Sequence, residues 1–233
     1  MATQTETVAE TRTPLTRDRV LRAAVDLADE SGIESLTMRN LGEALGVKAM
    51  SLYNHVTNKD DILNAVIDLV MSEIDQAAST IGGPSPQDDW KTAVRQRILA
   101  SRQILLRHPW APRVIETRAA MSLPMVKYFD GLLGLMREGG FSYDLAHHAL
   151  HVLGSRALGF TQEMFDEESD AAQEESQAML EQMAEHVPYI VEMMAEITHG
   201  EPESTLGWCD DQFEFEFGLD LILDGLDRVR ARG

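Results

Sequence analysis

The chain has 233 residues, 44% of them hydrophobic, and a formal charge of -19. This length allows one large domain or a small domain joined to a larger one, with enough apolar side chains for a buried core. No run of about 18 apolar residues occurs, so we expect no membrane-spanning helix. The first residues lack the apolar core of a secretion signal, and the single cysteine, Cys209, excludes an internal disulfide framework. Both features favour a reducing, cytoplasmic location.

Positive charge is distributed unevenly along the chain. Residues 1–65 carry 7 basic and 10 acidic side chains, whereas residues 66–233 carry 13 basic and 29 acidic ones. No Lys or Arg occurs from Ala157 to Asp227. Because phosphate binding needs Lys and Arg, only the N-terminal part has enough relative positive charge to approach DNA.

The N-terminal part has clear helix start and stop signals. Residues 1–15 are rich in Thr and Glu, and we expect a disordered arm there. Thr16 fits the N-cap of a first helix that Gly32 ends. Thr37 fits the N-cap of a second, short helix that Gly46 ends.

Two further helices are expected before the first clear break. A short one is predicted over residues 49–55. Asn58 fits the N-cap of the next, and Asp60 and Asp61 in its first turn favour the helix dipole. Residues 81–86 contain Gly-Gly and two prolines, so a helix cannot continue through them.

The remainder is helical in pattern. Interruptions are expected at residues 108–112 and 139–140, where prolines or paired glycines occur. Long helices are expected over residues 144–165, 179–198 and 210–230. No stretch alternates convincingly enough to be a strand, so the chain is predicted to be all-α.

The segment from Gly32 to Leu63 has the pattern of a helix-turn-helix. Two short helices flank a tight turn at Gly46, where glycine can adopt the positive φ that the turn demands. The second helix of such a pair enters the major groove with its N-terminal residues facing base edges. Its exposed positions are predicted to be Lys48, Ala49, Met50, Ser51, Tyr53 and Asn54.

The side chains in this segment have suitable chemistry for DNA. Leu52 and Val56 are predicted to face the core, and Arg39 can bind a guanine through two hydrogen bonds. The suitable phosphate partners are Ser51, Tyr53, His55 and Lys59. The alternative is a helical hairpin whose polar side chains are merely solvated.

The run GIESLTMRNLGEALGV, followed by LYNHVTNKDDIL, resembles the N-terminal domain of the tetracycline-repressor (TetR) family. The similarity covers residues 16–75, and its most characteristic run is L-Y-x-H-x-x-x-K from Leu52 to Lys59. Ala49 and Met50 suit contact with thymine methyl groups. The resemblance implies phosphate contacts by Thr37, Tyr53, His55 and Lys59, and base contacts by Arg39, Ala49, Met50 and Ser51.

Weaker similarity extends over the rest of the chain. REGGFSYDLAHHAL, LGSRALGF, TQEMF and FGLDLILDGLDRV resemble the ligand-binding domain of the tetracycline-repressor subclass. Residues 141–165 and 211–230 would then pair with the same helices of a second chain as a four-helix bundle. Gly154, Ala157 and Gly159 allow close helix approach. The alternative is that these helices pack only within one chain.

The combined prediction is an all-α protein. An N-terminal three-helix helix-turn-helix DNA-binding domain, residues 16–61, is joined by a long fourth helix to a larger helical effector-binding and dimerisation domain, residues 62–233. The middle helices are expected to enclose the effector, although Met and aromatic residues at helical spacing are more often plain core. The candidate lining residues are Leu105, Trp110, Val114, Thr117, Met121, Met125, Phe129, Met136, Phe160 and Met164.

No cofactor or metal is expected. A tetracycline–magnesium effector is disfavoured, because the family binds that chelate through a central-helix histidine and none occurs here between Pro109 and Ala146. His147, His148 and His151 could share a metal. No nearby carboxylate or cysteine completes a set, so buried or interface histidines are the expectation.

The predicted function is ligand-responsive repression of transcription from a palindromic DNA operator by a homodimer. A small, largely apolar effector would move the fourth helix, residues 58–78, and release the DNA. One alternative is a helical enzyme or small-molecule-binding protein with a non-functional helix-turn-helix; the absence of any catalytic grouping disfavours an enzyme. Another is an architectural DNA-binding protein, which the net acidity disfavours.

Overall fold

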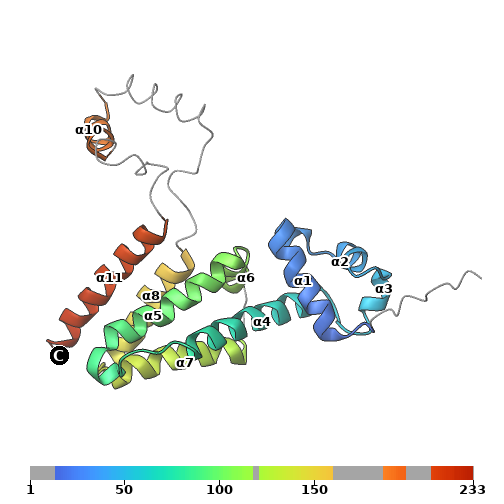
Figure 1. The fold of residues 1–233 in the computed structure, drawn as a ribbon, viewed down its shortest axis with the longest axis horizontal. Coiled ribbons are helices and arrows are strands. Elements are labelled where there is room, and N and C mark those ends of the chain that lie inside the picture. Colours follow the sequence, from blue (N-terminus) through green and yellow to red (C-terminus); the bar gives the residue numbers. More distant parts are fainter. Residues whose placement is uncertain (1–13, 118–120, 160–185, 198–210, 233) are drawn as a thin grey trace, which may run out of the picture. The chain divides into compact units, whose positions relative to one another are not determined.

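The computed structural model describes residues 14–117, 121–159, 186–197 and 211–232. Every regular element in these ranges is a helix (Figure 1), which confirms the all-α prediction. None of the described helices is long and apolar enough to cross a membrane. The expected N-terminal arm lies almost wholly outside the described residues.

The chain forms two compact units. The first comprises residues 1–81 and 100–130, and the second comprises residues 82–99 and 131–233. Two helices, α5 (Pro86–Arg107) and α7 (Leu123–Glu138), contribute to both units. The domain boundary predicted between residues 61 and 62 stays a prediction.

The first unit begins with a group of helices whose starts follow from local capping. Thr16, Thr37 and Asn58 each accept a hydrogen bond from the backbone N–H three residues further on, at 3.2, 3.1 and 2.8 Å. These three predicted caps are confirmed. The helices are α1 (Arg17–Ser31), the short 3₁₀ helix η1 (Ile33–Ser35), α2 (Met38–Ala44), α3 (Ala49–Leu52) and α4 (Lys59–Ser79).

Two glycines turn the chain between these helices. Gly32 after α1 has φ +77°, and Gly46 between α2 and α3 has φ +65°, a region that other residues rarely adopt. One continuous apolar core then joins α1, α2, α3 and α4. Its buried side chains include Val20, Ala24, Ala28, Leu41, Leu52, Val56, Ile62 and Val66.

The rest of the first unit is built from the end of α5, α6 (Ala111–Glu116) and the start of α7. The interruption predicted at residues 108–112 is confirmed, since α5 ends at Arg107 and α6 begins at Ala111. The break between α6 and α7 was not predicted, because no glycine marks it. The Ser101 hydroxyl donates a buried hydrogen bond of 2.9 Å to the Tyr128 hydroxyl, which joins α5 to α7.

The second unit contains α8 (Tyr143–Gly159), α10 (Pro188–Ile197) and α11 (Asp211–Arg230). α8 packs against α11 through the buried side chains Ala146, Ala149, Leu153, Phe215, Leu219 and Leu223. The interruption predicted at residues 139–140 is confirmed, and Gly140 there has φ +87°. The expected helices over 144–165 and 179–198 extend partly outside the described residues.

An acidic column on α11 accounts for much of the negative charge in this unit. Arg95 of α5 pairs with Glu216 and Asp220, both at 2.6 Å, and Lys91 pairs with Asp224 at 3.0 Å. The Trp90 indole N–H donates to Asp227 at 3.2 Å. These carboxylates therefore attach α11 to α5 within the second unit.

Candidate nucleic-acid interface and ligand-binding region

The two helices of the predicted helix-turn-helix approach each other closely at Gly42 of α2. A Cβ at this position would lie 3.0 Å from the Val47 carbonyl oxygen and 3.1 Å from the Ala49 backbone nitrogen. Only glycine allows this approach without displacing backbone. Sequence reasoning missed this role, although an isolated glycine within a helical pattern is a signal of close packing.

α3 and its following turn divide into a buried and an outward side. Leu52 is 0% and Val56 is 3% exposed, as predicted, whereas Met50 is 75% and Tyr53 is 48% exposed. The regular helix ends at Leu52, three residues earlier than predicted. The exposed predicted contacts are Thr37, Arg39, Lys48, Met50, Tyr53, Asn54 and Lys59, and the half-buried ones are Ala49, Ser51 and His55.

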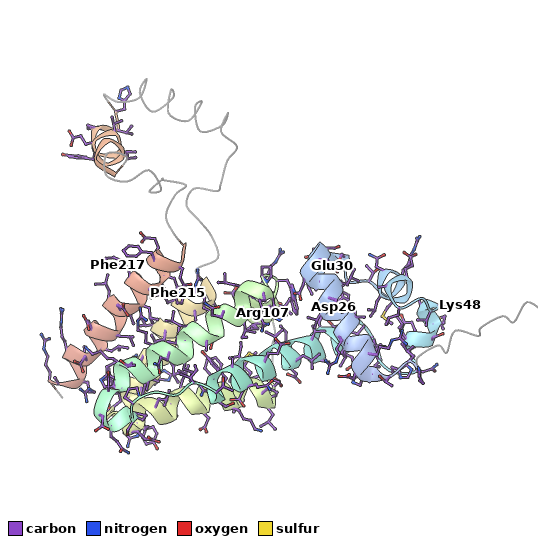
Figure 2. All side chains as sticks on the ribbon, in the orientation of Figure 1. Asp26, Glu30, Lys48, Arg107, Phe215 and Phe217 are labelled. Atoms are coloured by element: carbon purple, nitrogen blue, oxygen red, sulfur yellow. The ribbon has the colours of Figure 1, made fainter. Side chains whose placement is uncertain are left out.

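All ten predicted DNA contacts therefore lie at least partly on the surface, and Figure 2 labels Lys48 at the start of α3. Arg39 forms an ion pair of 3.0 Å with Glu43, but the two side chains are 84% and 65% exposed. Such exposed pairs contribute only about 0–1 kcal/mol, so this pair does not prevent Arg39 from binding DNA.

A guanidinium clamp holds the turn after α3. Arg17 donates to both carboxylate oxygens of Asp61, at 2.7 and 3.0 Å, and to the His55 carbonyl oxygen at 2.8 Å. Asp61 also accepts from the Thr57 backbone N–H at 2.8 Å. These hydrogen bonds, the Arg17 one first, lower the pKa of Asp61 from its ordinary 3.8 to about 2. Sequence reasoning missed Arg17, which lies 44 residues from Asp61.

The predicted effector-lining residues have differing environments. Leu105, Trp110, Val114, Met125 and Met136 are buried, Phe129 is half-buried, and Thr117 and Met121 are exposed. Phe160 and Met164 lie outside the described residues. Met136 belongs to the second unit and the other described candidates to the first. Their role as a ligand lining stays a prediction.

The histidines of α8 do not form part of a metal site in the described residues. His147, His148 and His151 are all exposed, so the expectation of buried histidines is wrong. The rings of His147 and His151 have centroids 4.7 Å apart. Among the residues that the structure describes, no group of three or more His, Cys, Asp and Glu side chains could hold a metal ion.

α11 carries an exposed apolar stripe. Phe213, Phe217 and Leu221 follow each other at intervals of four residues, and they are 63%, 55% and 59% exposed. The rings of Phe213 and Phe217 stack with centroids 6.4 Å apart. Phe215, labelled beside Phe217 in Figure 2, is by contrast buried against the rest of the second unit.

The arrangement of α2, the Gly46 turn and the outward-facing α3 defines a helix-turn-helix DNA-binding protein. Residues 20–66 match the family model for bacterial regulatory proteins of the tetR family, and residues 83–230 match the tetracyclin repressor-like C-terminal domain. The chain is 31% identical to the tetracycline repressor protein class C of Escherichia coli, over 93% of this chain and 92% of that protein.

Solved structures show the same relationship. A possible TetR family transcriptional regulator from Streptomyces coelicolor A3(2) has a TM-score of 0.71 and 30% identity, over 91% of this chain and 99% of that one. The Streptomyces coelicolor protein ActR in complex with actinorhodin has a TM-score of 0.65 and 26% identity, over 92% of this chain and 96% of that one.

The chain belongs to the TetR family of bacterial regulatory proteins. It is a ligand-responsive transcriptional repressor with a DNA-binding helix-turn-helix and a ligand-binding domain, and its relatives are regulators rather than enzymes.

Proposed function

We propose that the chain represses transcription as a homodimer that places two copies of α3 in major grooves of one palindromic operator. The observation that carries this proposal is the outward face of α3, where Met50 and Tyr53 are exposed while Leu52 is fully buried. The half-sites of such an operator would lie about 34–36 Å apart, or a multiple of this spacing. A repressor acts where its DNA is, so we propose the cytoplasm as its location.

Within this proposal the ten predicted residues divide by chemistry. Phosphate contacts are assigned to Thr37, Tyr53, His55 and Lys59, which offer hydroxyl, imidazole and ammonium donors. Base contacts are assigned to Arg39, Ala49, Met50 and Ser51, with Lys48 and Asn54 at the edge of the groove. The net charge of the chain opposes DNA as a whole, so these few donors have to provide local attraction.

The second chain is proposed to pair through residues 141–165 and 211–230. The exposed stripe of Phe213, Phe217 and Leu221 on α11 supports this proposal, because exposed apolar side chains at helical spacing are typical of helix-bundle interfaces. The effector is proposed to be small and largely apolar, because the buried candidates Leu105, Val114 and Met125 offer apolar surface.

The test is selection of bound duplexes from a random pool, followed by affinity measurements on the selected duplex. A sequence with dyad symmetry is expected. Lys59→Ala should weaken binding to the selected duplex about fivefold or more and reduce its salt dependence, because one phosphate contact is lost. Lys127→Ala, an exposed lysine on α7, changes the net charge equally and is expected to bind as the wild type does. Equal affinities of the two variants, or a pool without enrichment, would refute the proposal.

A further inference from the structure

Asp29 at the end of α1 accepts hydrogen bonds from a distant segment of the first unit. The Trp110 indole N–H donates to one of its carboxylate oxygens at 2.6 Å. His108 Nδ1 lies 2.8 and 3.0 Å from its two oxygens. Because an ionised carboxylate only accepts hydrogen bonds, this ring nitrogen carries a proton. Three short polar contacts therefore converge on one side chain of α1.

The same segment also reaches α4. His108 Nε2 lies 3.4 Å from a carboxylate oxygen of Glu73, and Arg107 pairs with the same oxygen at 3.1 Å. The segment from Arg107 to Trp110 thus joins α5 and α6 to both α1 and α4, and Figure 2 labels Arg107 at the end of α5. The Asp29 and Glu73 carboxylates lie opposite Arg107 and His108, so the cluster is rich in charge-assisted hydrogen bonds.

Burial distinguishes this cluster from an ordinary surface ion pair. The His108 and Trp110 residues are each 6% exposed. Charge-assisted hydrogen bonds in such surroundings are screened little by water, and removing one partner leaves a poorly solvated polar group. A displacement of Trp110 therefore costs free energy unless Asp29, and α1 with it, follows.

We propose that Asp29 is a positioning residue that couples α6 to α1, so that a change at α6 reaches the helix-turn-helix through α1 as well as through α4. Trp110, predicted above as an effector-lining side chain, then has its polar end on the DNA-binding side of this link. The inference rests on the proposed function and adds a second route to the movement of the fourth helix.

Linkage makes the coupling measurable without an identified effector. If α6 influences DNA binding, DNA binding influences α6 by the same free energy. The probe is the duplex recovered from the random pool, and the readout is amide hydrogen exchange in the full chain, with and without that duplex. In the wild type, the duplex is expected to change exchange over residues 111–117 as well as over α1–α4.

Trp110→Phe keeps the apolar ring and removes the N–H, and Asp29→Asn keeps an acceptor but removes the charge. Each variant is expected to bind the duplex within about threefold of the wild type while the exchange response at α6 falls about threefold or more. Trp90→Phe is the matched control, because it removes an indole N–H bond to Asp227 in the second unit. It should keep the full α6 response.

The outcomes separate the two proposals. A duplex that binds the wild type without changing exchange at α6 refutes the coupling and leaves the proposed function standing. An α6 response in Trp110→Phe and Asp29→Asn equal to that in the wild type also refutes it. No duplex binding by the wild type refutes the proposed function, and the coupling falls with it. Thermal unfolding of each variant establishes that it is folded; if Trp110→Phe is not, Asp29→Asn decides.

Discussion

Asp61→Asn is expected to destabilise the chain at neutral pH and to have little effect in acid. The pKa of Asp61 falls from 3.8 to about 2 in the folded chain, which corresponds to roughly 2 kcal/mol in favour of the ionised folded form. Since the Arg17 and Asp61 side chains are 46% and 27% exposed, solvent screening reduces this contribution to about 1 kcal/mol.

The sign of the pH dependence follows from the lowered pKa. The folded chain binds this proton less readily than the unfolded chain, so the stabilisation is fully present above about pH 4–5 and is lost as the pH falls towards 2. Thermal unfolding followed by circular dichroism at pH 7 should show a Tm about 2–4 °C lower for Asp61→Asn. The difference from the wild type should shrink as the pH falls from 5 to 3.

Asp60→Asn is the matched control for this prediction. It removes a charge from the same first turn of α4 but leaves the Arg17 pair with Asp61 in place. A favourable helix-dipole effect alone would make the two variants equally unstable. Equal Tm losses, or a loss for Asp61→Asn that persists unchanged at pH 3, would refute the clamp as the source of stability.

Two further predictions concern packing and assembly. Gly42→Ala should lower Tm and weaken duplex binding because its Cβ meets the α3 backbone, whereas Gly134→Ala on α7, where a Cβ meets nothing within 4 Å, should keep or raise Tm; equal Tm values would contradict the close approach. Leu221→Glu should convert a dimer into a monomer in sedimentation equilibrium, while Leu106→Glu, at a similarly exposed leucine on α5, should not. A Leu221→Glu dimer as tight as the wild type would place the interface elsewhere.

Local signals were sufficient for much of the first unit. Capping by Thr16, Thr37 and Asn58 depends on residues within one helical turn, so their sequence pattern is enough to predict it. The turn at Gly46 is equally local, because it needs one residue with positive φ. The end of α3 was predicted too late, since the turn after Leu52 still forms hydrogen bonds typical of a helix.

Long-range partners could not be predicted in this way. Asp29 reads from sequence as one more exposed acid of an acidic chain, and only folding brings it to Trp110, 81 residues away. The partnership of Arg17 with Asp61 has the same origin. A polar residue at a surface position fits many neighbours equally well, whereas an apolar stripe has to face a core.

The sequence by itself determined the all-helical class, the helix-turn-helix and its family, because helical periodicity, capping and a characteristic recognition segment are written in neighbouring residues. Tertiary structure decided which charged side chains act as connections: Asp29 with His108 and Trp110, and Arg95 with the acidic column of α11. The physical reason is that a hydrogen bond requires two atoms to lie within about 3 Å, and that distance is set by how helices far apart in sequence pack together.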